Sequence, residues 1–206
     1  MGLPAPGQPC MLFAMDSRGP LRHICVYCGS AVGADPRFAA GAAALGAAMA
    51  AAGIGLVYGG GNTGLMGIAA RSVLAGGGHV TGIIPEFLKS RELMLAGAQE
   101  MVVVPDMHTR KRIMFERADA FVALPGGIGT LEELFEQLTW VQLDQHVKPV
   151  LIANIAGFWD PLLALIGHVR AKGFVRGGLE PRYLLADDIA QVLPLLRQAC
   201  ARELAA

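Results

Sequence analysis

Short apolar runs recur along the chain, and most neighbouring runs are separated by a stretch long enough for a helix. The runs lie at 23–28, 54–58, 79–84, 100–104, 120–124 and 149–155. Nearly every position within them is apolar, whereas a strand with one solvated face would alternate apolar and polar residues. We therefore expect strands covered on both faces, as in a parallel sheet.

The intervening segments carry helix signals. Asp35 and Pro36 supply an N-cap and a first-turn proline for an alanine-rich helix that ends at Gly53. Further helices are expected at 63–75, 107–118, 131–143, 161–172 and 187–201. This alternation predicts an α/β fold, with a doubly wound parallel sheet flanked by helices. Because ligands of such sheets bind outside the carboxyl ends of the strands, the loops after the strands are candidate functional segments.

Composition limits the class of protein. The 206 residues are 53% hydrophobic and 17% charged, which indicates one compact domain. Basic and acidic residues balance at 17 each without a run of like charge, so we expect no nucleic-acid and no membrane partner and favour a small molecule. Residues 1–21 show no secretory or spanning pattern. We interpret them as a flexible N-terminal extension of a cytoplasmic protein whose domain covers 22–206.

Cysteine and histidine do not form a metal-binding pattern. Cys25 and Cys28 would point to opposite faces of a strand, and the other two cysteines lie far away. The five histidines are also far apart. We expect no metal, and we expect Cys25 and Cys28 to be small core residues.

The segment "YGGGNTGLMG" at 58–67 is the first candidate ligand loop. Gly59, Gly61 and Gly64 fit the spacing G-x-G-x-x-G of a dinucleotide site. However, the motif follows the second expected strand rather than the first, and no acidic residue ends a strand about 20 positions later. A tight turn, a phosphate or ribose cradle and a nicotinamide-dependent dehydrogenase all remain open.

The segment "PGGIGTLEE" at 125–133 is the second candidate ligand loop. Gly126, Gly127 and Gly129 let backbone N–H groups converge, and Thr130 adds a hydroxyl donor at a helix N-terminus, where the helix dipole favours an anion. The segment lacks the lysine of a P-loop. We therefore expect a monophosphate rather than a triphosphate with magnesium.

Two adjacent glutamates follow this loop. Glu132 and Glu133 are expected in the first turn of the helix, where the dipole explains one acidic residue but not two beside an anion site. A carboxylate next to a bound sugar phosphate suits hydrolysis of a glycosidic bond, because positive oxocarbenium character develops on the sugar.

The helix expected at 107–118 places Met107, Arg110, Met114 and Arg117 on one face. An ordinary solvated basic helix is the alternative. Because methionine suits adaptable surfaces, we expect this face to contact a ligand or a second subunit.

Taken together, these segments resemble the LOG (Lonely Guy) family of cytokinin riboside 5′-monophosphate phosphoribohydrolases. The resemblance rests on "CVYCGS", "VYGGGNTGLMG", "GIIP", "MHTRK", "ALPGGIGTLEEL" and "TWVQLDQHVKPV", in the family's order. It implies a Rossmann-like fold, no cofactor, and hydrolysis of the N-glycosidic bond of N6-modified adenosine monophosphates, and often AMP, to free base and ribose 5-phosphate. It also implies a homodimer with sites at the interface.

The resemblance further implies the site residues. Arg110 and Glu133 match the family's catalytic positions, and the residues leave open whether Arg110 positions the nucleotide or stabilises the departing base. Two positions depart from the family pattern: Ile128 stands where tyrosine is common, which bears on substrate preference, and Asp144 where glycine is usual, which bears on a turn. The implied substrate-binding residues are Ser30, Gly60, Gly61, Glu92, Met107, Lys111, Gly126, Gly127, Ile128, Gly129, Thr130, Glu132 and Thr139.

Two other functions stay open at this level. A non-catalytic nucleotide-binding or carrier protein would use the same glycine loops, although the retained Arg110 and Glu133 weigh against it. A PLP-dependent decarboxylase, a label attached to relatives of the family, needs a buried Schiff-base lysine. The candidates, Lys89, Lys111, Lys148 and Lys172, are all expected in loops or on helix surfaces.

Overall fold

The computed structural model describes residues 21–89, 95, 97–175 and 180–203. They form one parallel sheet in the strand order β4-β3-β2-β1-β5-β6-β7. The six expected strands are confirmed. A seventh strand, β7, was missed because it has only three residues at the sheet edge, too few for a clear apolar run. The strands are β1 (His23–Tyr27), β2 (Gly55–Tyr58), β3 (Val80–Pro85), β4 (Glu100–Val104), β5 (Ala120–Ala123), β6 (Val150–Ala153) and β7 (Leu184–Ala186).

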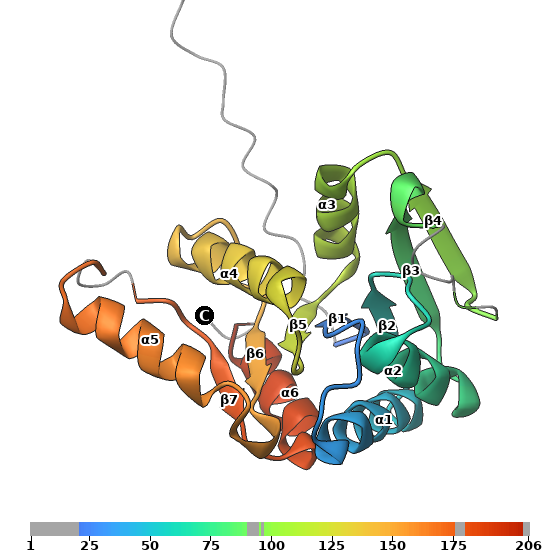
Figure 1. Ribbon diagram of the computed structural model, residues 1–206, viewed down its shortest axis with the longest axis horizontal. Helices are drawn as coiled ribbons and strands as arrows, with labels where there is room; N and C mark the ends of the chain where they lie inside the picture. Colours follow the sequence, from blue (N-terminus) through green and yellow to red (C-terminus); the bar gives the residue numbers. More distant parts are fainter. Residues whose placement is uncertain (1–20, 90–94, 96, 176–179, 204–206) are drawn as a thin grey trace, which may run out of the picture.

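Helices cover both faces of the sheet (Figure 1). One face carries α1 (Pro36–Ala51), α2 (Gly64–Ala75) and α6 (Val192–Glu203). The other carries α3 (Met107–Arg117), α4 (Ile128–Gln142) and α5 (Asp160–Ala171). Each layer encloses its own buried hydrophobic cluster against the sheet. The predicted doubly wound α/β architecture is therefore confirmed.

Local sequence signals place several elements correctly. The Asp35 carboxylate accepts a hydrogen bond from the Arg37 N–H at 2.9 Å and caps α1, as expected. The segment expected as one helix at 187–201 instead begins with a 3₁₀ turn, η3 (Ile189–Gln191), before α6. Asp144 has a φ of 52°, in the left-handed region that favours glycine, so this departure from the family pattern affects a turn, as predicted.

The two cysteines of β1 and its following loop are core residues on opposite faces of the sheet, as expected. Cys28 belongs to the cluster under α1, α2 and α6, whereas Cys25 belongs to the cluster under α3, α4 and α5. Burial raises the pKa of both thiols, and the nearby Glu133 charge raises it further. Both side chains are therefore thiols rather than reactive thiolates at neutral pH.

None of the helices in the described ranges combines the length and apolarity needed to cross a membrane. Within the same ranges, His, Cys, Asp and Glu side chains do not gather in a group of three or more that could hold a metal ion.

His146, just before β6, is a buried histidine in an aromatic environment. Its ring lies 5.1 Å from the Phe115 ring and 5.8 Å from the Phe121 ring, between centroids. Burial lowers the pKa of His146 from 6.5 to about 4, and the positive charge of Lys148 acts in the same direction. The native state therefore holds this ring neutral and binds fewer protons than the unfolded chain between pH 4 and 6.5.

This arrangement predicts acid lability. The free energy of unfolding should fall as the pH drops from 6.5 towards 4, by up to about 3 kcal/mol from this residue alone. His146→Phe removes the titrating group, so its stability should depend less on pH over that interval. Urea unfolding of both proteins at pH 7 and pH 4.5 measures the difference. Equal pH dependence in the two proteins would contradict the buried neutral ring.

Candidate active site

The candidate site lies where the strand order reverses. The chain runs outward from β1 to β4 on one side and from β5 to β7 on the other, and ligands of such sheets bind at the reversal. The loops after β1, β2 and β5 meet there. The Gly29 N–H donates to the Pro125 carbonyl at 3.0 Å, and the Leu65 N–H donates to the Gly29 carbonyl at 3.0 Å. The two glycine segments singled out from the sequence are therefore neighbours.

In the segment after β2, the fold itself requires one of the glycines. Gly64 has a φ of 57°, and a Cβ there would overlap the backbone of Ser30. A tight turn with a close loop contact therefore explains this position without a ligand. Ser30 itself is exposed, whereas Gly60 and Gly61 are buried beneath the junction.

The loop after β5 contains glycines of two kinds. A Cβ on Gly126 would overlap the Thr130 side chain and lie 2.9 Å from the Gly29 nitrogen. In contrast, a Cβ on Gly127 or Gly129 would meet nothing within 4 Å. The fold thus requires Gly126, whereas the space at Gly127 and Gly129 is open to a ligand.

This open space faces the N-terminus of α4. Gly127 is the N-cap and offers no side-chain cap, and the first bond of the helix runs from the Leu131 N–H to the Gly127 carbonyl at 3.0 Å. The N–H groups of residues 128–130 consequently have no acceptor within the helix. Together with the helix dipole, they form an end suited to a phosphate.

Glu132 and Glu133 do not lie in the first turn of α4, as the sequence suggested. The helix begins at Ile128, three residues earlier than expected, and its first turn contains no acidic residue. Both glutamates therefore belong to the second turn. Stabilisation of the helix dipole falls off within the first turn and does not account for them.

Arg110 of α3 and Glu133 of α4 face one another. Both are largely buried, with 7% and 9% of their surface exposed. Arg110 Nη2 lies 3.9 Å from Glu133 Oε1 and donates to the Gly59 carbonyl at 3.4 Å. A Cβ on Gly59 would overlap that nitrogen. The three elements thus hold a guanidinium and a carboxylate together in a mostly dry environment.

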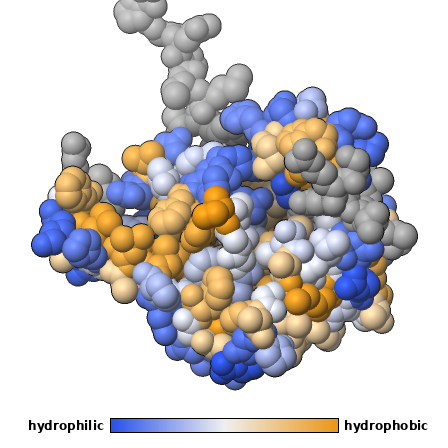
Figure 2. Space-filling model, in the orientation of Figure 1, coloured by the Kyte–Doolittle hydropathy of each residue, from blue (hydrophilic) through white to orange (hydrophobic). Residues whose placement is uncertain are grey.

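Lys111 and Glu132, both expected to bind substrate, contact each other. Lys111 Nζ lies 2.6 Å from Glu132 Oε1 and 3.0 Å from Glu136 Oε2. Hydrophilic residues gather between α3 and α4 on the face shown in Figure 2. A second group of ion pairs therefore lies beside the Arg110–Glu133 pair. Lys111 follows Arg110 on α3, and Glu132 precedes Glu133 on α4.

The remaining expected site residues differ in position. Met107 Sδ lies 3.6 Å from Arg110 Nη1. Ile128 is the first residue of α4, at the helix end suited to a phosphate, and it is 82% exposed. Thr139 lies about 14 Å along α4 from Thr130 at 1.5 Å per residue, and its hydroxyl donates to the Phe135 carbonyl. Glu92 lies outside the described residues.

Along α3, Met114 is a core residue with 1% of its surface exposed, so packing explains it. Arg117, expected on the same face, pairs with Glu100 of the edge strand β4. The predicted methionine and arginine face is thus divided, and only its first turn, from Met107 to Arg110, reaches the site.

Sequence reasoning missed two contributors, Gly59 and Glu136. Gly59 was interpreted as the first glycine of a possible G-x-G-x-x-G motif, whereas in the structure its carbonyl and its missing side chain place Arg110. Glu136 stands four positions after Glu132 on the same helical face, a spacing that would have identified it as a second partner for one cation.

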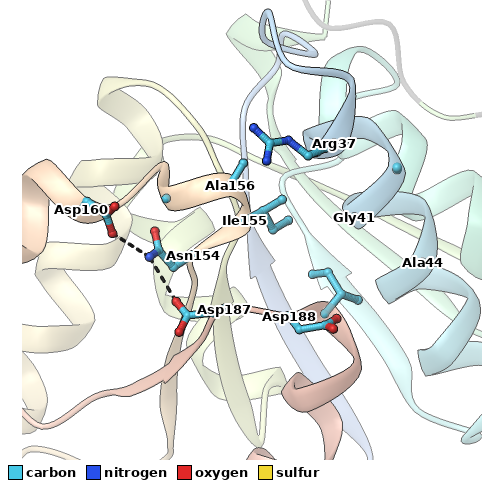
Figure 3. Close-up of a pocket in the computed structure, with 12 residues that line it drawn as sticks. Arg37, Gly41, Ala44, Asn154, Ile155, Ala156, Asp160, Asp187 and Asp188 are labelled. Atoms are coloured by element: carbon cyan, nitrogen blue, oxygen red, sulfur yellow. Dashed lines mark hydrogen bonds between the residues drawn. The ribbon is translucent and has the colours of Figure 1, made fainter.

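A separate cavity of about 700 Å³ opens at the carboxyl ends of β6 and β7 beside α1 (Figure 3). Asn154 is one of its lining residues and donates to Asp160 Oδ1 at 2.8 Å and Asp187 Oδ1 at 3.2 Å. None of the site residues expected from the sequence is among those that line it. The cavity is thus distinct from the Arg110–Glu133 site.

Comparison with known proteins places the chain in a family. The model of the family described as "Possible lysine decarboxylase" matches residues 66–196. A probable cytokinin riboside 5′-monophosphate phosphoribohydrolase of Oryza sativa subsp. japonica is 45% identical over 184 residues, covering 89% of this chain and 80% of the relative. A cytokinin riboside 5′-monophosphate phosphoribohydrolase of Arabidopsis thaliana is 43% identical over 183 residues, covering 89% of this chain and 86% of the relative.

Solved structures share the fold. The molybdenum cofactor carrier protein of Chlamydomonas reinhardtii superposes with a TM-score of 0.68 at 22% identity, covering 88% of this chain and 99% of that one. A molybdenum cofactor binding protein of Rippkaea orientalis gives a TM-score of 0.65 at 22% identity, covering 86% of this chain and 96% of that one. At this identity, the likeness concerns architecture alone.

Proposed function

This chain belongs to the LOG family of cytokinin riboside 5′-monophosphate phosphoribohydrolases, and from that premise we propose that it hydrolyses the N-glycosidic bond of adenosine 5′-monophosphates, including N6-modified ones. The products are the free base and ribose 5-phosphate. One observation carries the proposal: the buried Arg110–Glu133 pair stands beside a helix N-terminus whose glycines leave open space.

We propose that the 5′-phosphate of the nucleotide binds at the N-terminus of α4. The N–H groups of residues 128–130 and the Thr130 hydroxyl are the donors for the 5′-phosphate, while Ser30, Gly60 and Gly61 border the ligand from the adjoining loops. The ribose then faces α4. Glu133 stands three residues after Thr130, about one helical turn, which brings its carboxylate to the sugar.

Bond cleavage follows from this placement. As the bond between C1′ and the base breaks, the sugar gains positive charge, which the Glu133 carboxylate stabilises. Water then forms the new bond to C1′, and Glu133 accepts a proton from it. Arg110 fixes the Glu133 carboxylate and the nucleotide. The base leaves with the electron pair of the broken bond and takes up a proton from solvent, while Glu133 returns to solvent the proton that it accepted from water.

We also propose that the enzyme is a cytoplasmic homodimer. Ile128 and Phe135, two turns apart on the same side of α4, and Leu143 at its C-cap are all exposed. An apolar strip of this kind, next to the site, fits burial against a second copy. Light scattering after gel filtration should give twice the chain mass, and Phe135→Glu should shift it towards the single chain. A wild-type monomer at assay concentration would oppose this part of the proposal.

The decarboxylase alternative finds little support in the lysines. Lys148 precedes β6, at the amino end of that strand, and donates to the Phe115 carbonyl at 2.8 Å. Lys111 is held between two carboxylates, and Lys172 is exposed. Lys89, the fourth candidate, follows β3 and pairs with Glu86 at 3.1 Å. The two lysines on the carboxyl side of the sheet, Lys89 and Lys111, are thus both engaged with carboxylates.

The test is a product assay without added metal or cofactor. The purified protein is incubated with AMP and with isopentenyl-adenosine monophosphate, and free base and ribose 5-phosphate are followed by chromatography. Release of base from either nucleotide is expected. Nucleotide binding without release would instead favour a non-catalytic nucleotide-binding or carrier protein on this scaffold.

Glycine substitutions separate the proposed phosphate site from the fold. Gly129→Ala meets no atom in the structure and adds a better helix former, so we expect unchanged or slightly higher stability. Its methyl group would, however, occupy space meant for the phosphate, and KM for AMP should rise about tenfold or more. Gly126→Ala, which overlaps Thr130, should instead lower the melting temperature. A normal KM in Gly129→Ala would place the phosphate elsewhere.

A further inference from the structure

Three side chains of the segment at 139–150 gather around one aromatic ring of α3. They belong to Trp140, His146 and Lys148, and the proposed function assigns none of them a role. The Phe115 ring lies 5.2 Å from the Trp140 ring and 5.1 Å from the His146 ring, between centroids. Lys148 Nζ lies 4.1 Å from the centroid of the same ring. The segment is therefore in close contact with the helix that precedes it in the chain.

Lys148 also contacts the backbone of α3. Its Nζ donates to the Phe115 carbonyl at 2.8 Å. Phe115 belongs to the last turn of α3, where carbonyl groups lack their usual helical donors and the helix dipole favours a cation. The Asp119 N–H, four residues on, donates instead to the His23 carbonyl, and the Ala118 N–H reaches Phe115 only at 3.3 Å. Lys148 thus caps α3 with both a hydrogen bond and a charge.

α3 depends on such contacts because little of its surface is buried. Of its eleven residues, only Arg110 and Met114 are buried. The partly buried Phe115 ring adds contacts to two further elements, since it stacks on Phe121 of β5 at 5.9 Å and meets Trp140 of α4. The place of α3 on the sheet is therefore set largely by what surrounds Phe115.

The Arg110–Glu133 pair is sensitive to this placement. Its separation of 3.9 Å is longer than a hydrogen bond, so the pair does not fix its own geometry. Phe115 follows Arg110 by about 8 Å along α3, and Trp140 follows Glu133 by about 11 Å along α4, at 1.5 Å per residue. The contact between the two rings consequently joins the same two helices one to two turns beyond the pair.

We propose that Lys148 is a positioning residue for the reaction: by capping α3 and holding the Phe115 ring, it keeps Arg110 at its distance from Glu133. This inference rests on the proposed function. Lys148 precedes β6 and so lies at the amino end of that strand, whereas the nucleotide is proposed to bind beyond the carboxyl ends. Lys148 therefore acts through α3 and not by contact with the substrate.

A double-mutant cycle tests this role. Lys148→Met keeps an unbranched side chain but removes the charge and the donor, so kcat/KM for AMP should fall about tenfold as Arg110 moves. Lys148→Arg keeps both and should stay within about threefold of wild type. In the Arg110→Lys background, Lys148→Met should cost less than about threefold, because the group through which it acts is already changed.

Two further variants complete the set. Lys172→Met, the same substitution at the exposed C-cap of α5, is the control and should leave kcat/KM unchanged. Lys148→Gln keeps a neutral donor for the carbonyl and takes the place of Lys148→Met in the cycle if that variant does not fold. Melting temperatures fix an assay temperature at which every variant is folded.

The cycle separates positioning from a purely structural role. A Lys148→Met protein that melts earlier but keeps wild-type kcat/KM overturns the proposal. An equally large loss in both backgrounds overturns it too, because Lys148 would then act independently of Arg110. Since Arg110 also holds the nucleotide in the proposed site, calorimetric dissociation constants for AMP should show the same coupling. A wild type that binds AMP without releasing base refutes the hydrolase, while these constants still test Lys148.

Discussion

Replacing Glu133 with glutamine is expected to slow base release by at least about 10²-fold, the scale of losing an acid/base or electrostatic group, while nucleotide binding is largely kept. Glutamine has the shape of glutamate but cannot carry the negative charge that stabilises the oxocarbenium, and it cannot accept a proton from water. Because Glu133 is largely buried against Arg110, water cannot substitute for the lost charge.

Single-turnover base release and AMP affinity measure the two effects separately. A matched control is Glu116→Gln, the same substitution on α3 at an exposed carboxylate that pairs with Arg112 at 2.7 Å. The control should retain wild-type turnover, because exposed pairs of this kind contribute little. Undiminished turnover in Glu133→Gln would remove Glu133 from the mechanism.

Replacing Arg110 with lysine is expected to reduce kcat/KM by about 10²-fold even though the positive charge is kept. The guanidinium reaches the Gly59 carbonyl, the Met107 sulfur and the Glu133 carboxylate from one planar group. A single ammonium cannot replace this fork, so Glu133 and the nucleotide lose their common anchor.

Arg112→Lys is the control on the same helix, because Arg112 is exposed and forms an ion pair with the exposed Glu116. Gly59→Ala offers an independent route to the same defect, since its methyl group would displace the Arg110 guanidinium without changing its chemistry. If Arg110→Lys matched wild type in kcat/KM, charge alone would be sufficient and the fork geometry would be irrelevant.

Elements that depend on local or near-local physics could be predicted from the amino-acid sequence. Six apolar runs predicted six strands, and five of them are buried on both faces, which requires apolar residues at nearly every position. The sixth, β4, lies at the sheet edge and is only partly buried. Asp35 capped its helix, and the alternation of elements fixed a doubly wound sheet. The start of α4 was predicted three residues too late, because Gly127 and Gly129 have low intrinsic helix propensity and suggested a loop. In the structure the close packing of Gly126 against Thr130 and Gly29 places the helix start there.

The composition of the candidate site, in contrast, depends on how whole helices and loops pack together. Arg110 and Glu133 stand on different helices, and nothing in their spacing measures a distance of 3.9 Å. The sheet order brings α3, α4 and the loop after β2 together. Arg110 can therefore donate to the Gly59 carbonyl, and Lys111 can form an ion pair with Glu136. These contacts depend on the positions of whole elements. The sequence named the residue types that the chemistry needs, whereas the packing of α3 and α4 decided which charges face each other.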